Sequence, residues 1–346
     1  MFQGKERLAV ETLAEPACGE GEALLRVGAC GICGGDARSF FQGDKFTGAR
    51  RIPGHEAAGV IEAVGAGVAR WKPGDRVALA ADVHCGECYY CRRELFNLCD
   101  SLRILGKHID GGLADCMLLT AAILARGIIN PIPEGLSMLH AAVSEPLCSV
   151  LASHDELAIE AGENVAVTGS GPMGILHLEL LRARGARVIL IDLAAQRLER
   201  ARADFGADSV VDASKEDVVA RVKAMTGGAG ADAAIVAAPS AAAVAQSIRL
   251  VRKRGRVGLF GGLPAAQAEV ALDINRVHYS ELRLAGNFSY HPRYHEKALA
   301  LLASGAIRAG SLITTYRIEE TGQALYDIRE GRVLKAVVIP NQGALL

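Results

Sequence analysis

The sequence predicts a mixed α/β fold with two domains, one a doubly wound parallel sheet and the other rich in β-strands. Three observations lead to this prediction. The chain has 346 residues, a length typical of about two domains, and 50% of them are hydrophobic, which is enough for two cores. From about residue 150 onwards, short apolar runs alternate with helical stretches, as in parallel sheets joined by helices. Before that point, glycine and proline turns separate strand-like segments.

The first part of the chain reads as a series of strands. A strand is expected over Glu22–Cys30, and a glycine-rich turn and a basic loop follow it. Further strands begin after Glu56, at Lys72–Ala80 and at Asp110–Leu119, and a helical stretch begins near Ser137. In the second part we expect strands at 208–212, 232–238, 256–262 and 282–288 and helices near 215–225, 240–252 and 294–303. The tail, which contains a further strand, is expected to return to the first domain.

Three glycines with a fixed spacing open the second part. The apolar run Val165–Val167 precedes Gly169, Gly171 and Gly174, in the pattern G-x-G-x-x-G, and a helical segment follows. The first glycine permits a tight turn, the second lets backbone approach a pyrophosphate, and the third lets the helix pack on the strand. Asp192 ends the next apolar run, about 20 residues later, where a carboxylate accepts hydrogen bonds from the adenosine ribose. Because this charge repels a 2′-phosphate, the sequence predicts NAD rather than NADP.

Composition excludes several classes of function. The formal net charge of −1 gives no general attraction for nucleic acid or for an anionic membrane surface. No run approaches the roughly 18 apolar residues that cross a membrane, and the N-terminus carries no secretory hydrophobic segment. The nine cysteines are an odd number in a long chain, which indicates a reducing compartment rather than a disulfide framework. We therefore expect a soluble, cytoplasmic protein with a small-molecule partner.

Four cysteines form a cluster with the spacing of a metal site. They follow the pattern C-x-x-C-x-x-C-x7-C, and they are Cys85, Cys88, Cys91 and Cys99. Four thiolates suit a closed tetrahedral zinc site with a structural role, since no position is left open for a substrate. A redox pair or unrelated surface thiols are the alternative, and the spacing differs from that of common iron–sulfur sites.

A second set of candidate ligands has a different composition. Cys33 is separated by about 20 residues from the adjacent pair His55 and Glu56. One thiolate, one imidazole and one carboxylate leave a tetrahedral zinc with an open position, which is typical of a catalytic site. The residues alone also permit a histidine packed in the core and an ordinary acidic residue.

The order of these motifs resembles that of the zinc-dependent medium-chain alcohol dehydrogenases, and in particular their sorbitol (polyol) dehydrogenase-like branch. The resemblance covers nearly the whole chain. It is carried by GICGGD (31–36), PGHE (53–56), KPGDRV (72–77), the cysteine quartet, DGGLAD (110–115), EPL (145–147), GSGPMG (169–174) and Asp192. It implies a GroES-like catalytic domain with a structural-zinc lobe, formed by residues 1–149 and 286–346, and a Rossmann NAD-binding domain at 150–285.

The resemblance also implies roles for individual residues. Two zinc ions per chain are expected, and the catalytic one is assigned to Cys33, His55, Glu56 and Glu145. Glu145 is expected near the metal or its water, with a helix-start carboxylate as the alternative. Asp36 is expected to accept a hydrogen bond from the second ring nitrogen of His55. The residues expected to bind NAD are Gly169, Gly171, Pro172, Met173, Gly174, Asp192, Arg197 and Phe288. A homo-oligomer, dimeric or tetrameric, is expected as well.

The sequence departs from the family at several positions. Gly35 stands where members commonly have serine or threonine, whose hydroxyl begins a proton relay. Either a zinc-bound water with Glu56 or Glu145 replaces it, or the hydroxyls of the substrate do, or turnover is slow. Arg38 stands where members often have histidine. Ser289 replaces a common arginine, and this second difference moves the expected substrate away from sorbitol. The next residue, Tyr290, is interpreted as either a substrate contact or a core residue. The cations Arg38, Lys45, Arg50 and Arg51 are interpreted as solvated loop charge, with an anionic substrate as the alternative.

These observations predict an enzyme, a zinc-dependent NAD-linked alcohol or polyol dehydrogenase. It would transfer hydride between NAD and a secondary alcohol of a polyol, cyclitol or sugar alcohol, giving a ketone. The alternatives are an L-threonine dehydrogenase-like enzyme, a polyol-phosphate dehydrogenase, and a catalytically weak NAD-binding protein suggested by Gly35. The exact substrate, the physiological direction and the choice between dimer and tetramer are not determined by the sequence.

Overall fold

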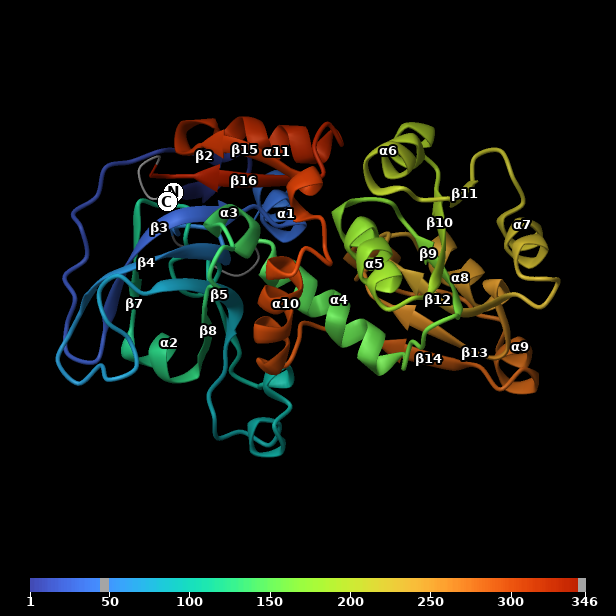
Figure 1. Ribbon diagram of the computed structural model, residues 1–346, viewed down its shortest axis with the longest axis horizontal. Coiled ribbons are helices and arrows are strands. Elements are labelled where there is room, and N and C mark those ends of the chain that lie inside the picture. The colour runs from blue at the N-terminus through green and yellow to red at the C-terminus, as the bar shows by residue number, and fades with distance from the viewer. Residues whose placement is uncertain (44–49, 342–346) are drawn as a thin grey trace. The chain divides into compact units, whose positions relative to one another are not determined.

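The computed structural model describes residues 1–43 and 50–341, which divide into two compact units (Figure 1). The first unit comprises residues 1–148, 290–305 and 312–346, and the second comprises 149–289 and 306–311. One helix, α4 (Ser144–Glu156), runs from the first unit into the second. These units are defined by packing alone. The predicted catalytic domain (1–149 with 286–346) and NAD-binding domain (150–285) remain a prediction.

The first unit is built on an eight-stranded sheet. Its strand order is β15-β16-β3-β4-β5-β6, with β7 paired to β3 and β8 paired to β5, and all of these pairs except β15–β16 are antiparallel. The strands are β3 (Ala23–Gly31), β4 (Glu56–Val64), β5 (Arg76–Val83), β6 (Arg103–Ile104), β7 (Cys116–Leu119), β8 (Gly127–Pro131), β15 (Ile313–Arg317) and β16 (Lys335–Ile339). A separate hairpin joins β1 (Phe2–Gly4) to β2 (Arg7–Leu8). The helices that belong to this unit are α1 (Gly34–Gln42), α2 (Ala121–Arg126), α3 (Met138–Ala141), α10 (Arg293–Ala303) and α11 (Thr321–Arg329).

The second unit is a six-stranded parallel sheet with the order β11-β10-β9-β12-β13-β14. Its strands are β9 (Asn164–Thr168), β10 (Arg187–Asp192), β11 (Ser209–Asp212), β12 (Ala231–Val236), β13 (Val251–Leu259) and β14 (Arg283–Gly286). The helices are α5 (Pro172–Ala183), α6 (Ala195–Phe205), α7 (Val218–Met225), α8 (Ala241–Leu250) and α9 (Ile274–Tyr279). The chain winds outward from β9 in both directions, so the predicted doubly wound parallel sheet is confirmed.

Burial explains why these segments form strands. The central strand β9 is apolar and its three middle residues are fully buried, as expected for a parallel strand that helices cover on both faces. Each unit has its own core, one around Leu25, Ile61 and Leu79 and the other around Ile191 and Val257. Among the helices of the described residues, none combines the length and the apolarity needed to cross a membrane.

The sequence analysis left several elements unmentioned. It named neither α2 with the following strand β8, nor helix α11, and the strand that it expected over Asp110–Leu119 is reduced to β7. The glycine pair Gly111 and Gly112 explains the shortening, because a side chain at Gly111 would overlap the Gly54 carbonyl oxygen, only 2.0 Å from the ideal Cβ position. The backbone therefore passes too closely for a regular strand at that point.

Candidate active site and metal centres

Cys33 occupies the N-cap of helix α1, directly after the central strand β3. Its Sγ accepts a hydrogen bond from the Gly35 backbone N–H (3.3 Å), and the Asp36 carboxylate accepts one from the Cys33 N–H (2.9 Å). This reciprocal arrangement is a capping box, which fixes the start of the helix. The thiol therefore has a position set by two backbone hydrogen bonds, at a helix end that favours negative charge.

His55 and Glu56 reach the same place from the start of β4. Strands β3 and β4 pair so that Glu56 lies opposite Gly31. The ideal Cβ position of Gly31 is 2.0 Å from Glu56 Oε2, so only glycine leaves room for this carboxylate. One ligand atom each from Cys33, His55 and Glu56 lie within 4.8 Å of one another. The structure therefore brings together three of the four residues that the sequence analysis assigned to the catalytic zinc.

The fourth predicted residue, Glu145, is not part of that group. It lies in the first turn of α4 and is 7% exposed. Burial, reinforced by the neighbouring charge of Glu56 and opposed by that of His55, raises the pKa of Glu145 to about 7. Its Oε1 accepts a hydrogen bond from the Tyr290 hydroxyl (2.5 Å). Glu145 thus lies within electrostatic range of the group without joining it.

A lysine that the sequence analysis did not consider completes the surroundings of Glu56. Lys335, at the start of β16, donates to Glu56 Oε1 (2.5 Å) and to the Ile32 carbonyl (3.0 Å), and it forms an ion pair with Oε2. Burial lowers the pKa of Lys335, but the charges of Glu56 and Cys33 outweigh that effect and raise it. The only sequence signal was a lysine that opens an otherwise apolar strand.

The predicted hydrogen bond between Asp36 and His55 is not formed. His55 Nδ1 lies 3.7 Å from Asp36 Oδ1, too far for a hydrogen bond, because the other oxygen of Asp36 caps helix α1. The interaction is electrostatic instead. Burial lowers the pKa of His55, but Asp36 and Cys33 together raise it well above the ordinary value. The negative surroundings that favour an imidazolium also favour a bound metal cation.

The donor set fits zinc. His55 Nδ1 and Glu56 Oε2 are buried without a hydrogen-bond partner among the described residues, and each has only an electrostatic neighbour, Asp36 for Nδ1 and Lys335 for Oε2. With the thiol ionised, Cys33, Asp36 and Glu56 carry three negative charges, which Lys335 balances only in part. A divalent cation would neutralise much of the remainder, and a sulfur, a nitrogen and an oxygen ligand are those that zinc takes in catalytic sites.

The cysteine quartet is brought together as predicted from its spacing. The Sγ atoms of Cys85, Cys88, Cys91 and Cys99 lie within 4.8 Å of one another. Backbone N–H groups of the same loop donate to these sulfurs, including Cys88 N to Cys85 Sγ and Cys91 N to Cys88 Sγ (3.4 Å each). The hydrogen bond from Cys91 lowers the pKa of Cys88 to about 6. Four converging sulfurs with N–H···S support match a closed zinc site.

The glycine motif forms a tight turn between β9 and α5. Gly169 has a φ of +102°, which favours glycine, and a Cβ on Gly174 would lie 1.8 Å from the Gly169 carbonyl oxygen. Nothing lies within 4 Å of the ideal Cβ of Gly171, and Pro172 begins the helix. The open backbone at Gly171 and the unpaired N–H groups of the helix start fit a pyrophosphate.

Asp192 has partners within this turn. Its Oδ2 accepts from both the backbone N–H (2.6 Å) and the hydroxyl (2.7 Å) of Ser170, and its Oδ1 accepts from the Ala194 N–H (2.9 Å). A carboxylate has about four acceptor positions, so Oδ1 retains capacity for a ribose hydroxyl. Arg197 is exposed on the first turn of α6, Met173 is partly buried in α5, and Phe288 is 58% exposed.

A lysine lies next to the space that a side chain at Gly35 would occupy. The ideal Cβ position of Gly35 lies 3.4 Å from Lys107 Nζ and 3.6 Å from Cys33 Sγ. Of the basic residues after α1, Arg50 pairs with Glu11 and Arg51 with Asp110, while Lys45 lies outside the described residues. The sequence analysis did not single out Lys107.

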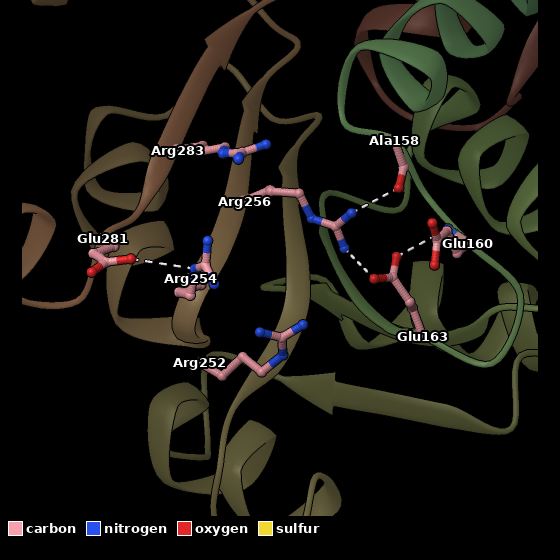
Figure 2. Close-up of a pocket in the computed structure, with 8 residues that line it drawn as sticks. All are labelled: Ala158, Glu160, Glu163, Arg252, Arg254, Arg256, Glu281 and Arg283. Atoms are coloured by element: carbon pink, nitrogen blue, oxygen red, sulfur yellow. Dashed lines mark hydrogen bonds and ion pairs between the residues drawn. The ribbon is translucent and has the colours of Figure 1, made fainter.

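Figure 2 shows a pocket of about 450 Å³ in the second unit that contains none of the predicted site residues. Three of its arginines are paired with carboxylates: Arg252 with Asp232, Arg254 with Glu281 and Arg256 with Glu163. Arg254 and Glu281 are both highly exposed, so their pair contributes little to stability. The pocket is a charged surface hollow and offers none of the chemistry described above.

The fold and these sites together define a class: a zinc-binding oxidoreductase with a nicotinamide dinucleotide cofactor. Comparisons with known proteins identify the family. The alcohol dehydrogenase GroES-like domain family matches residues 19–130, and the zinc-binding dehydrogenase family matches residues 172–304. The chain belongs to the zinc-type medium-chain alcohol dehydrogenases, in their polyol branch.

Individual relatives match nearly the whole chain. D-arabitol-phosphate dehydrogenase from Enterococcus avium is 33% identical, over 98% of this chain and 95% of its own. Sorbitol dehydrogenase from Bacillus subtilis (strain 168) is 31% identical, over 99% and 97%. A crystal structure from Sinorhizobium meliloti 1021, described as a zinc-binding dehydrogenase bound to NADP, has a TM-score of 0.88 at 32% identity, covering 97% of this chain and 96% of that one. These findings confirm the predicted family, fold class and type of enzyme.

Proposed function

We propose that this protein is an NAD-linked, zinc-dependent dehydrogenase that converts a secondary alcohol of a polyol, cyclitol or sugar alcohol into a ketone. The observation that carries the proposal is the convergence of Cys33, His55 and Glu56 within 4.8 Å, in a donor set that suits a catalytic zinc. We assign Glu145 to the same site, and the quartet Cys85, Cys88, Cys91 and Cys99 to a structural zinc. Two zinc ions per chain are therefore expected.

Zinc bound there supplies Lewis acidity, which lowers the pKa of a coordinated hydroxyl, and NAD supplies the hydride acceptor. The residues of the chain hold the metal and provide a path for the proton. Cys33 and His55 would hold the metal, and Lys335 orients the Glu56 carboxylate within the same group. Gly35 has no hydroxyl to begin a proton relay, so we expect the alcohol proton to leave through water and Glu56 or Glu145, or through the hydroxyls of the substrate.

We assign the cofactor to the turn Gly169–Gly174, with Gly171, Pro172, Met173, Asp192, Arg197 and Phe288 as contacts. The remaining acceptor capacity of Asp192 Oδ1 supports binding of the adenosine ribose, and its charge supports NAD over NADP. The NADP in the Sinorhizobium meliloti structure makes this preference a point to test.

A second candidate is the oxidation of an anionic polyol, such as a polyol phosphate or a sugar acid. Two observations favour it: the ammonium of Lys107 lies 3.4 Å from the ideal Cβ position of Gly35, two residues after Cys33, and a relative at 33% identity is a D-arabitol-phosphate dehydrogenase. A lysine ammonium is a compact cation that binds phosphate or carboxylate groups. An L-threonine dehydrogenase-like enzyme and a catalytically weak NAD-binding protein are the remaining alternatives.

One substrate panel tests these candidates. Free and phosphorylated polyols, cyclitols, sugar acids and L-threonine would be assayed with NAD and with NADP at the nicotinamide absorbance, alongside zinc analysis. The proposal expects two zinc ions per chain and NADH formation on a polyol. One zinc ion with tight NADH binding and no turnover would contradict it. If the substrate is anionic, Lys107→Met lowers kcat/KM for it at least tenfold while neutral polyols change little.

We also place the protein in the cytoplasm and expect it to form a homo-oligomer, dimeric or tetrameric. The edge strand β14 and the preceding helix α9 carry large exposed hydrophobic side chains, including Ile274, Tyr279 and Leu284. An edge strand offers unpaired backbone groups to a second copy. Light scattering after size exclusion would measure the mass in solution.

A further inference from the structure

We propose that Tyr290 is a positioning residue of the active site, whose hydroxyl holds the Glu145 carboxylate in one orientation beside the Cys33, His55 and Glu56 group. This inference rests on the proposed function, because it concerns the assigned catalytic zinc site. It replaces the two roles that the sequence left open for Tyr290, substrate contact and simple core packing.

The directions of two hydrogen bonds show that the Tyr290 hydroxyl accepts from Ala81 and donates to Glu145. The backbone N–H of Ala81 lies 3.0 Å from the Tyr290 hydroxyl oxygen, and Glu145 Oε1 lies 2.5 Å from the same oxygen. An amide N–H can only donate, so the hydroxyl oxygen accepts from Ala81. The single hydroxyl hydrogen is then directed at Glu145 Oε1, which accepts it. The backbone amide of Ala81 therefore fixes the Tyr290 hydroxyl, and that hydroxyl in turn orients the Glu145 carboxylate.

Burial makes this arrangement rigid. Tyr290 is 2% exposed, Glu145 is 7% exposed and Ala81 lies in the sheet strand β5. Water has little access to compete for the short hydrogen bond, and a medium of low polarity strengthens it. A hydroxyl that is buried and already has two partners is also poorly placed to bind a substrate.

The three residues come from distant parts of the chain. Ala81 lies in the central sheet, Glu145 begins α4, and Tyr290 precedes α10. The hydrogen bonds therefore connect the sheet to the Glu145 side chain at the start of α4. Because Oε1 is held by Tyr290, Oε2 is the oxygen available to a metal ion or to water bound there.

The test compares Tyr290→Phe with Tyr294→Phe. Both changes remove one hydroxyl from a buried tyrosine of the same segment, but the Tyr294 hydroxyl is paired with Arg293 and not with a site residue. Each protein would be loaded with zinc, or with cobalt as a spectroscopic probe, and assayed for kcat, KM and retention of metal against a chelator. Tyr290→Phe should change the visible cobalt bands, lose one metal ion at least tenfold faster, and lower kcat at least tenfold with little change in the KM for NAD.

Tyr294→Phe should match the wild type in all of these measurements. Combining Tyr290→Phe with Glu145→Ala should give no further loss beyond Glu145→Ala alone, because Tyr290 acts through that carboxylate. A Tyr290→Phe enzyme with wild-type cobalt bands and kcat would overturn the inference. If the wild type binds a single metal ion and turns over no alcohol, the proposed function fails instead, so the two failures are distinguishable.

If Tyr290→Phe fails to fold, a second variant at the same position tests the inference. Replacement of Tyr290 by 4-aminophenylalanine keeps a hydrogen-bond donor at the same place on the ring. The inference expects this protein to fold and to restore the wild-type cobalt spectrum. A folded protein with altered bands, despite the restored donor, would contradict it.

Discussion

At the scale of single residues, the contact between Lys335 and Glu56 dominates the electrostatics of the candidate active site. Both side chains are buried, and the ammonium contacts both carboxylate oxygens. Removing charges from water is costly, and the attraction between them compensates only when the pair is complete. The two buried side chains therefore depend on each other.

We expect Lys335→Met to destabilise the metal-free protein by about 3–5 kcal/mol, because it leaves a buried carboxylate without a partner. Unfolding by denaturant can be followed through Trp71, the single tryptophan of the chain, which is buried in the first unit. Adding Glu56→Gln should recover much of the loss. As a control, Lys215→Met removes an exposed lysine that pairs with Asp212 and should cost less than about 1 kcal/mol. Equal effects of the two lysine changes would contradict the prediction.

At the scale of secondary-structure elements, the segment from Cys85 to Cys99 has little regular structure of its own. It contains only two short 3₁₀ turns, Cys91–Arg93 and Phe96–Leu98. Several of its side chains are exposed, including those of Tyr89 and Leu95. With few apolar contacts, such a lobe depends on its metal for order, because metal binding and folding are coupled in small sites.

Cys99→Ser is therefore expected to remove one zinc ion per chain and to loosen residues 85–99 while the second zinc ion stays bound. Metal analysis would show the loss, and limited proteolysis would show new cleavage within that segment. Cys116→Ser changes a cysteine outside both metal groups and provides the control. Loss of both zinc ions in Cys99→Ser, or of neither, would disagree with this expectation.

At the scale of the whole molecule, stability should depend on pH through a buried pair of histidines in the second unit. His154 Nε2 and His177 Nδ1 lie 2.9 Å apart, and the outer nitrogen of each ring has no hydrogen-bond partner in the described part of the chain. Burial lowers the pKa of His177 to about 3 and that of His154 well below its ordinary value. The folded protein therefore keeps both rings neutral at a pH where the unfolded chain binds protons.

The stability associated with His177 is fully present above pH ~6.5, the ordinary pKa of histidine, and is lost as the pH falls towards 3. One such imidazole costs roughly 1.4 kcal/mol per pH unit in that range. Urea unfolding followed by circular dichroism should thus show a loss of at least about 2 kcal/mol between pH 7 and pH 5. His177→Gln should reduce this loss by about that amount, whatever its stability at pH 7. An unchanged pH dependence in His177→Gln would contradict the assignment.

Much of the molecule could be predicted from local patterns. The spacing of the four cysteines, the glycine motif with Asp192, and the alternation of strands and helices are short-range features, and they predicted the metal cluster, the turn and the parallel sheet. The contact of Asp36 with His55 was predicted as a hydrogen bond and is not one. Lys107 and Lys335 were not considered, because no linear pattern places Lys107 beside Gly35 or Lys335 beside Glu56, which are far apart in the chain.

The sequence by itself determined the family, the two kinds of metal-ligand set and the parallel sheet. These features depend on residue types at short spacings, and local backbone geometry brings residues at such spacings together. Only the tertiary structure decided the partners of those residues. Lys335 meets Glu56 across nearly the whole length of the chain, and Tyr290 links Glu145 to the amide of Ala81. Burial and the pairing of distant strands set these contacts, and with them the charge and the rigidity of the site.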